Sequence, residues 1–290
     1  IAILTDSSCD LPQQYFKKYP IFRLPLIVTC GETAYRDGVD ITADEVYRRQ
    51  PDEDFKTSLP LREDVNATFD AIARAGYRQV VVLPLSSALS STTNQLRLIA
   101  AERTDLEITV FDTRRCASAG LGMLAVQAAQ YAVSGMAFVR LKEVVARLIE
   151  DTTVFFCIDT LEYLRRGGRI GRVTAVAGSL LQIKPILTIG SDGVIGTAAK
   201  VRGRSAAFAK LLDLVEAVRQ EAPPAPAFNL VVCDGAWPEE GRRLEEQLKK
   251  RVPGFHQLLH GSIDATLAVH LGPHLRGAGI QFLPTTPPPV

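Results

Sequence analysis

The sequence predicts an α/β protein with two domains: an N-terminal parallel-sheet α/β/α domain over residues 1–150 and a C-terminal two-layer α/β domain with a mixed sheet over residues 151–290. Short apolar runs alternate with polar loops and helical patterns in the first half, which is typical of βαβ units. In the second half, Ser191-Asp192-Gly193 separates two apolar segments and indicates a hairpin, and therefore a mixed sheet. A length of 290 residues also suits two domains of about 100–200 residues each.

The expected elements of the first half are strands at 1–4, 80–83 and 108–111 and helices at 64–76 and 120–133. Each of the three strands ends at hydroxyl or carboxylate side chains. Because ligands of parallel sheets bind outside the carboxyl ends of the strands, this coincidence is the first indication of function. Asp6 and Asp112 follow two of these strands, and we expect both to organise loops by accepting backbone N–H bonds rather than to bind a metal.

The expected elements of the second half are strands at 153–158, 180–189, 194–201, 228–233 and 280–283 and helices at 205–221 and 239–251. A basic, glycine-containing turn is expected at 161–172, an extended proline-rich connector at 222–226 and a disordered tail at 284–290. His256 and His260 are four residues apart and would share one face of a helix, but no H-E-x-x-H motif accompanies them.

Composition excludes several classes of protein. A hydrophobic content of 47% excludes general disorder, and a formal net charge of +1 argues against a protein that coats nucleic acid or an anionic membrane. No apolar run reaches the roughly 18 residues of a membrane span, and the first residues lack the pattern of a signal peptide. The five cysteines form no C-x-x-C pair, so we expect reduced thiols and a cytoplasmic location.

Hydroxyl side chains concentrate in two segments, 56–60 and 86–93. Such clusters can hold a carboxylate or phosphate, although Ser and Thr at strand ends also act as helix caps and turn residues. A hydrolytic serine needs a histidine base, and all four histidines lie after residue 255. No G-x-S-x-G motif surrounds any serine, so hydrolysis stays the alternative hypothesis.

Basic residues concentrate between residues 163 and 204. This window contains eight Lys or Arg and one Asp, so its charge is +7 and that of the remaining chain is −6. Glycines within the window would let backbone amides turn toward an anion, and arginines match phosphate geometry. The window therefore predicts a phosphate or acidic-partner surface, with solvated turn charges as the alternative. Neither a P-loop nor a G-x-G-x-x-G motif after a strand is present.

Several motifs in order along nearly the whole chain resemble those of the DegV family. They are Ile3-Leu4-Thr5-Asp6-Ser7-Ser8-Cys9-Asp10-Leu11-Pro12, Arg23-Leu24-Pro25-Leu26, Tyr35-Arg36-Asp37-Gly38-Val39-Asp40-Ile41, Thr57-Ser58-Leu59-Pro60, Ser86-Ser87-Ala88-Leu89-Ser90, Gly167-Gly168-Arg169-Ile170, Ile183-Lys184-Pro185-Ile186-Leu187 and Lys200-Val201-Arg202-Gly203. Each motif alone is weak, but eight in the same order are specific.

The resemblance implies a non-catalytic carrier that buries one long-chain fatty acid at the domain junction and presents its carboxylate to a separate fatty acid kinase, for phospholipid metabolism. By the same resemblance, the carboxylate is bound by hydroxyls and one histidine, and two arginines contact the phosphate or the partner. The residues that match are Thr57, Ser58, Ser87, Ser90 and His270 for the carboxylate and Arg169 and Arg202 for the phosphate or partner.

The resemblance further implies no cofactor, no metal, no nucleic acid partner and no integral membrane segment, with transient contact to a membrane or an acyltransferase. Two positions depart from the family pattern, because Ser91 and His274 stand where glycine is usual. We expect both to place larger side chains near the head group of the ligand. A Ser/His hydrolase of acyl esters is the alternative, and nucleotide binding by the arginine turn is a third hypothesis.

Overall fold

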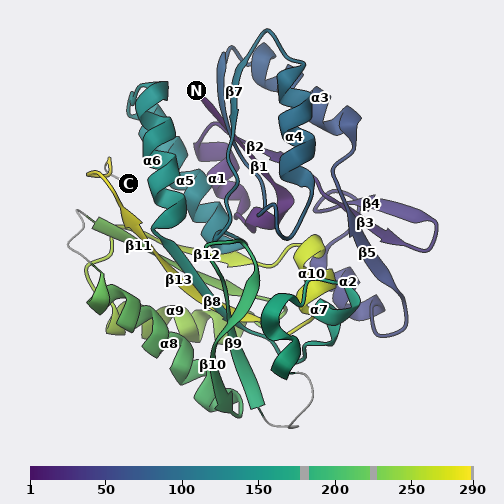
Figure 1. The fold of residues 1–290 in the computed structure, drawn as a ribbon, viewed down its shortest axis with the longest axis vertical. Helices are drawn as coiled ribbons and strands as arrows, with labels where there is room; N and C mark the ends of the chain where they lie inside the picture. Colours follow the sequence, from purple (N-terminus) through teal and green to yellow (C-terminus); the bar gives the residue numbers. More distant parts are fainter. Residues whose placement is uncertain (177–182, 223–226, 289–290) are drawn as a thin grey trace.

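The computed structural model describes residues 1–176, 183–222 and 227–288. Within them, the N-terminal sheet occupies the upper part of the molecule in Figure 1 and the C-terminal sheet the lower part. The N-terminal sheet is parallel throughout, as predicted, with the order β2-β1-β6-β7. Its strands are β1 (Ala2–Asp6), β2 (Ile21–Leu24), β6 (Gln79–Leu83) and β7 (Glu107–Val110).

Alternation along β1 sends successive side chains to opposite faces of this sheet. Ala2 and Leu4 pack in one apolar cluster with side chains of α3 and α4, whereas Ile3 packs in another with α5. The N-terminal sheet therefore has helices on both faces, as the α/β/α prediction requires. The helices of this half are α1 (Gln13–Lys18), α3 (Arg62–Arg74), α4 (Thr92–Ala101), α5 (Ala119–Val133) and α6 (Phe138–Glu150).

The C-terminal sheet is mixed, as predicted, with the order β10-β9-β8-β13-β11-β12. Only β11 and β12 pair in parallel among these strands; the other neighbours are antiparallel. The turn at 191–193 joins β9 to β10. The strands are β8 (Thr152–Cys157), β9 (Ile183–Ile189), β10 (Ile195–Arg202), β11 (Ala227–Asp234), β12 (Leu258–Ser262) and β13 (Arg276–Leu283).

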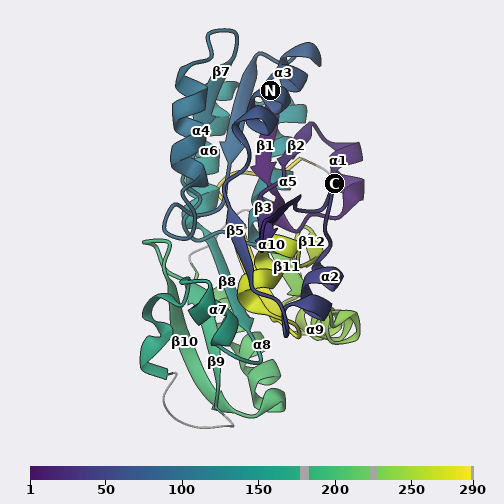
Figure 2. The same cartoon turned by 90° about the vertical axis from the view of Figure 1, so that its right-hand side faces the viewer.

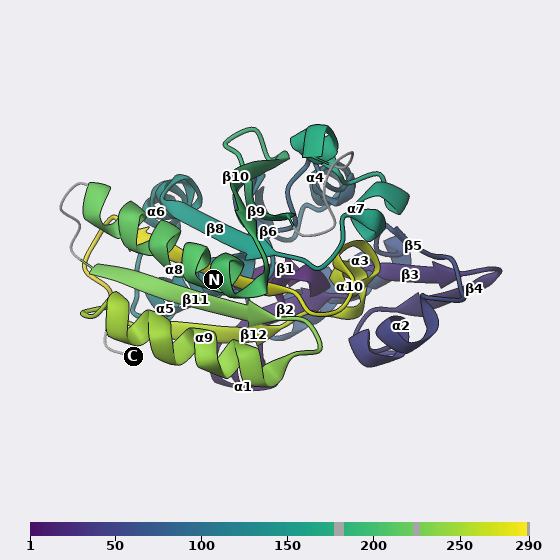
Figure 3. The ribbon, with the colours of Figure 1, turned by 90° about the horizontal axis from the view of Figure 1, so that it is seen from below.

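Helices cover both faces of the C-terminal sheet. Figure 3 shows α8 (Arg204–Glu221) and α9 (Pro238–Arg251) side by side beneath it. The other face contacts α5, which also contacts β1 and therefore lies between the two sheets. This position explains why nearly every residue of α5 is buried and why its sequence is Ala-rich and apolar all round.

Short elements lie along the junction of the two sheets, as the side view of Figure 2 shows. A small sheet of order β4-β3-β5 lies beside α10, which contacts α2, α7 and β5. These elements are β3 (Ile27–Cys30), β4 (Thr33–Arg36), β5 (Phe55–Ser58), α2 (Ala43–Arg49), α7 (Glu162–Arg166), α10 (Ala265–Leu271) and the 3₁₀ turns Ser7–Cys9 and Gly171–Val176. None of the strands or the helix α10 was predicted from the sequence.

Several expectations are corrected or stay open. The suggested helix face shared by His256 and His260 is wrong, because His260 lies in the strand β12. The expected boundary at 150/151 falls between α6 and β8 and stays a prediction. Residues 223–226 of the connector and 180–182 of the apolar segment lie outside the described residues.

The expected C-terminal tail has no helix or strand in its described part, residues 284–288, and residues 289–290 lie outside it. Nevertheless, Tyr131 Oη donates a hydrogen bond to the carbonyl oxygen of Thr285 at 3.0 Å. The helices of the described part are all too short or too polar to cross a lipid bilayer.

Candidate functional site

A cavity of about 290 Å³ lies between the two sheets. Its wall is mostly apolar and combines side chains of the N-terminal loops and α5 with side chains of β8, β11 and β13. A volume near 300 Å³ is at the lower end of the range of small-molecule sites. The apolar lining includes Leu26, Leu59, Leu85, Leu89, Val154, Phe155, Phe156, Leu164, Ile189, Ile195, Val231, Leu267 and Leu271.

The Ser, Thr, Arg and His side chains of the lining are Thr57, Ser58, Ser90, Ser91, Ser118, Arg169, Thr266 and His270. We call six of them the polar end of the cavity: Thr57, Ser58, Ser90, Ser91, Arg169 and His270. Ser58 and Ser91 are exposed, so this end faces solvent, whereas His270 is only 7% exposed. The structure thus brings together five of the seven residues that the sequence indicated.

His270 lies near the end of α10 and faces β5. Its Nε2 is hydrogen-bonded to Thr57 Oγ1 at 2.8 Å, across 213 residues of sequence. Its Nδ1 is buried and has no hydrogen-bond partner among the described residues. Burial lowers the pKa of His270 to about 4, and the positive charge of Arg169 acts in the same direction. The imidazole is therefore neutral at neutral pH.

Arg169 is held by two backbone carbonyls. Its Nε donates to the carbonyl oxygen of Leu89 at 3.1 Å and its Nη1 to that of Gly167 at 2.7 Å. These bonds join the basic turn to the serine loop and fix the guanidinium at the cavity wall. Arg169 is the charged member of the polar end, and its acceptors in the described structure are neutral carbonyls rather than carboxylates.

The other arginines of the basic turn are paired with acids. Arg165 and Arg166 both contact Glu162, and Arg172 contacts Asp192. Glu162 lies just before the +7 window, so the window excluded an acid that neutralises part of it. The expectation of an uncompensated anion-binding turn is therefore too simple for these three arginines.

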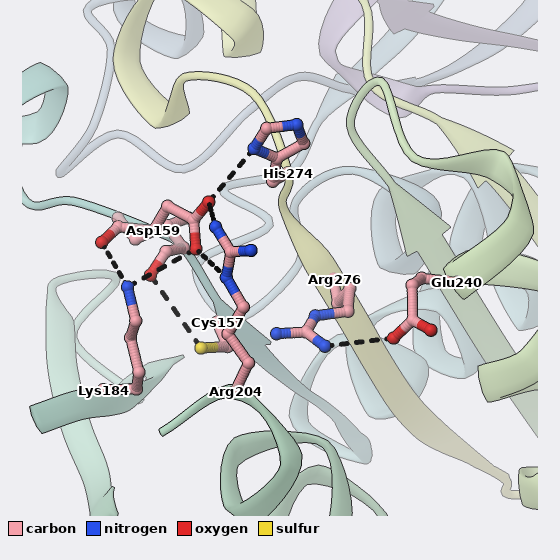
Figure 4. A network of polar contacts seen from close by, with 8 residues as sticks. Cys157, Asp159, Lys184, Arg204, Glu240, His274 and Arg276 are labelled. Atoms are coloured by element: carbon pink, nitrogen blue, oxygen red, sulfur yellow. Dashed lines mark hydrogen bonds and ion pairs between the residues drawn. The ribbon is translucent and has the colours of Figure 1, made fainter. Parts of the chain in front are cut away.

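A second polar network surrounds Asp159, which follows β8 (Figure 4). Its carboxylate contacts Arg204 at 2.7 Å, His274 Nδ1 at 3.0 Å and Lys184 at 3.4 Å. This carboxylate also lies outside the window and compensates two more of its cations. His274 adopts a left-handed backbone conformation with φ of 65°, which costs a non-glycine residue free energy.

Three expected positions lie away from the polar end. Ser87 is exposed and its Oγ donates to Asp112 Oδ2 at 2.6 Å. Arg202 is exposed at the end of β10 and does not line the cavity. His274 does not line it either, so only Ser91 of the two departures adds a side chain there.

The strand-end carboxylates organise loops, as expected. Asp6 accepts hydrogen bonds from the backbone N–H groups of Ser8 and Leu85, and Asp112 from that of Ser87. Burial raises the pKa of Asp6 to about 6 in spite of these donors. These bonds fix the loops that follow β1, β6 and β7 next to the cavity.

The geometry does not assemble a hydrolytic triad among the described residues. Ser90 Oγ is hydrogen-bonded to Thr92 Oγ1 at 2.8 Å instead of to a histidine. His270 has no carboxylate on Nδ1, and its low pKa makes it a weak base. The arrangement can bind and orient a polar group without activating a nucleophile.

Sequence reasoning missed Gly167 and the apolar walls. A Cβ atom at Gly167 would lie 2.0 Å from His270 Nδ1, so the ring packs directly on the glycine. The G-G-R spacing indicated this turn but not its contact with a histidine about 100 residues later. The apolar runs predicted as strands, such as those of β8 and β11, were the signals for the wall, and they did not distinguish cavity lining from core.

The fold and the site define a class: α/β proteins with an internal, mostly apolar cavity that has one polar end between two sheets. The protein-family model described as "Uncharacterised protein, DegV family" matches residues 1–283 of this chain. The chain therefore belongs to the DegV family. A DegV domain-containing protein of Clostridium perfringens is 34% identical over 281 residues, 97% of this chain and 98% of that protein.

Solved structures of similar proteins share the fold over nearly the full length. A fatty-acid-binding DegV family protein from Thermus thermophilus is 29% identical with a TM-score of 0.88, covering 97% of this chain and 99% of that one. A stearic-acid-binding protein from Eubacterium ventriosum is 30% identical with a TM-score of 0.86, covering 97% of each chain.

Proposed function

We propose that this chain binds one long-chain fatty acid, with its carboxylate at the polar end and its acyl chain in the apolar part of the cavity. The observation that carries the proposal is a mostly apolar cavity in which the charged side chain, Arg169, lies together with hydroxyls and His270 at the polar end. Similar proteins of the same fold are described as binding fatty acids, one of them stearic acid.

Burial of the acyl chain dominates the affinity. Each buried methylene contributes about 0.8 kcal/mol, so a chain of about 15 methylenes contributes about 12 kcal/mol before the ordering costs of ligand and protein. The polar end then fixes the direction in which the acid enters. It must also replace the hydration of the carboxylate, because an unpaired buried charge is costly.

The electrostatics of the polar end suit a carboxylate. Arg169 supplies the positive charge, and the hydroxyls of Thr57, Ser58 and Ser90 supply hydrogen-bond donors. His270 is neutral without ligand, and a bound carboxylate would favour its protonated form. The histidine therefore responds to the ligand and is not a preformed second charge.

We infer that the protein is a carrier that presents the carboxylate to a separate fatty acid kinase in the cytoplasm and catalyses no step itself. The exposed Ser58 and Ser91 leave the polar end accessible to a partner. Arg202, exposed on β10, is proposed as a partner contact together with Arg169. Transient contact with a membrane or an acyltransferase and the two-domain division at residue 150 remain predictions.

Mass spectrometry tests the ligand. Purified protein is denatured and extracted, and the extract is analysed for long-chain acids with a delipidated sample as control. We expect about one equivalent of acid per chain. An extract without long-chain acid, together with no thermal stabilisation by added stearate or oleate, refutes the proposal.

Arginine variants test the partner contact. Arg202→Ala is expected to retain fatty acid binding and to slow phosphorylation of the bound acid by a bacterial fatty acid kinase. Arg140→Ala, on the exposed face of α6 with an ion pair to Glu143, is the matched control. Equal phosphorylation of the wild type, Arg202→Ala and the control would contradict a role of Arg202 in presentation.

A further inference from the structure

The helix α10 depends on carboxylates from the first 40 residues for its position. It has seven residues, fewer than an isolated helix needs, yet it carries His270. Asp37 accepts hydrogen bonds from the backbone N–H groups of Ala265 at 2.9 Å and Thr266 at 3.0 Å. Asp10 Oδ1 accepts from the N–H of Asp264, immediately before the helix, at 2.8 Å. The N-terminal half therefore anchors the helix that supplies the histidine of the site.

Two of the buried carboxylates near this anchor are fully hydrogen-bonded. Asp37 Oδ2 also accepts from Ser7 Oγ at 2.8 Å, so both of its oxygens have donors. Asp6 accepts from Ser8 through one oxygen and from the N–H of Leu85 through the other. Each oxygen of these two carboxylates therefore has a hydrogen-bond donor.

Asp10 and Asp264 are different, because each has an oxygen without a donor. Asp10 Oδ2 and Asp264 Oδ2 are both buried and have no hydrogen-bond partner among the described residues. Asp10 is 3% exposed. Arg23 Nη1 lies 3.8 Å from Asp264 Oδ2, which is beyond hydrogen-bond distance. Two ionised carboxylates at this place would leave adjacent negative charges with Arg23 as the cation that faces them, at 3.8 Å from the partly exposed Asp264.

The surroundings of the pair offer little other compensation. The titratable and charged groups that face it are one cation, Arg23; the hydrogen-bonded carboxylates Asp6 and Asp37; the thiols of Cys9 and Cys233; and the phenol of Tyr47. Burial raises the pKa of Asp10, and burial followed by the charge of Asp37 raises the pKa of Asp264 to about 7. The described residues contain no group of three or more His, Cys, Asp or Glu side chains arranged for a metal ion.

We propose that the neighbouring acids Asp10 and Asp264 together bind one proton in the folded state. This proton is a latch that keeps α10 in place against the N-terminal half, so that ligand retention weakens as the pH rises. The second part rests on the proposed fatty acid binding. Loss of the proton places two carboxylates against each other at the start of α10. The helix then shifts, and His270 leaves Thr57 at the polar end of the cavity.

The direction of the pH effect follows from linkage. An acid whose pKa is raised by folding binds its proton more tightly in the folded state, so stability falls as the pH rises from the unfolded value near 4 to the folded value. With a folded pKa of about 7, the folding equilibrium constant falls on the order of 30-fold between pH 5.5 and 8.5 through this group. The latch is therefore closed below about pH 6 and weakened above about pH 8.

A substitution that mimics the protonated acid tests the latch. We measure unfolding of the delipidated full chain by denaturant between pH 5.5 and 8.5 for the wild type and Asp264→Asn. Over this pH range, the folding equilibrium constant of the wild type is expected to decrease about 30-fold more than that of the variant. Asp112→Asn is the control, because Asp112 organises a loop and has a lowered pKa. Burial raises the pKa of Asp112, but hydrogen bonds from Ser87 and Arg114 outweigh this effect. Parallel curves for the wild type and Asp264→Asn refute the shared proton.

Carbon NMR of the wild type covers the case in which Asp264→Asn fails to fold. With ¹³C-labelled aspartate carboxyls, we expect an Asp10 or Asp264 signal that titrates near pH 7. Titration of both Asp10 and Asp264 below pH 5 overturns the proposal, whatever Asp6 does.

Binding of the fluorescent fatty acid cis-parinaric acid at pH 6 and pH 8 tests the link to the cavity. Between pH 6 and pH 8, the wild type is expected to lose more affinity for the probe than Asp264→Asn. Equal losses would refute the effect of the proton on ligand binding. If the unfolding curves diverge but neither protein binds the probe at either pH, the shared proton stands and the proposed ligand is wrong.

Discussion

Gly167 packs against the ring of His270, and an added methyl group there tests how the polar end is built. The backbone of Gly167 has φ of −75° and ψ of −4°, which alanine adopts without strain, so the perturbation is purely steric. The new Cβ would lie 2.0 Å from His270 Nδ1 and 2.6 Å from its Cε1. Contacts this short force the ring or the turn to move by more than 1 Å.

The ring can move only by giving up its 2.8 Å hydrogen bond to Thr57. Overpacking of this kind costs about 1–3 kcal/mol of stability. Loss of the hydrogen bond at a buried site costs a similar 1–3 kcal/mol, which corresponds to a roughly five- to 150-fold weaker binding of a fatty acid. We therefore expect Gly167→Ala to fold, to unfold a few degrees lower, and to bind cis-parinaric acid at least about five-fold more weakly.

A double-mutant cycle with His270→Ala separates the steric contact from other effects. Once the ring is absent, Gly167→Ala has nothing to displace and should cost no further affinity. Gly168→Ala is the matched control, because its φ of +69° strains alanine but no side chain lies within 4 Å. The control should lose stability and keep its affinity. Additive losses in the cycle, or unchanged binding by Gly167→Ala, would refute this account of the polar end.

Three further substitutions probe the charge, the pH response and the junction. Arg169→Gln should weaken acid binding about 10- to 150-fold but not binding of a long-chain alcohol, measured by displacement of cis-parinaric acid; equal losses would contradict its pairing with the carboxylate. A hydrogen bond to Asp234 raises the pKa of His260, so its contribution is present below the unfolded value near 6.5 and is lost as the pH rises through the folded value. The melting temperature of wild type minus that of His260→Asn should therefore fall between pH 6 and 9, and a flat difference would disprove this. Gln257→Leu leaves the buried side-chain oxygen of Gln130 without its 2.9 Å donor and should cost about 1–3 kcal/mol in denaturant unfolding, whereas a smaller loss would mean that water replaces the donor.

The sequence predicted the elements whose pattern is local. Strand β1 and strand β6 are apolar runs that end at polar turns, and both were placed within two residues of their observed bounds. The helix α10 escaped prediction because its seven residues, Ala-Thr-Leu-Ala-Val-His-Leu, are all buried and show no helical periodicity. Its conformation is set by tertiary contacts, chiefly the carboxylates of Asp10 and Asp37, and not by its own residues.

The candidate site was predicted through resemblance more than through residue chemistry. Hydroxyls at strand ends were visible, but the contact of Thr57 with His270 spans 213 residues and leaves no local trace. Ser87 lies in a serine cluster, and this position suggested a ligand contact. In the structure, its hydroxyl instead donates a hydrogen bond to the carboxylate of Asp112. The charge of the basic window was overestimated because its boundary excluded Glu162 and Asp159. These acids lie just before the window and pair with four of its cations.

The position of the cavity also explains why so short a helix suffices to carry the histidine. The cavity wall includes Val154 and Val231 from the C-terminal sheet and Leu85 from a loop of the N-terminal sheet. A ligand that fills the cavity therefore contacts both halves, and its binding free energy adds to the stability of their junction by RT ln(1 + [L]/Kd). On the proposed function, an acyl chain in the cavity would add to the packing around α10, whose first residues are hydrogen-bonded by carboxylates and whose His270 is hydrogen-bonded to Thr57. If the proposed ligand binds there, its binding and the assembly of the junction are one coupled equilibrium, and a substitution at Asp10 or Asp264 should change both.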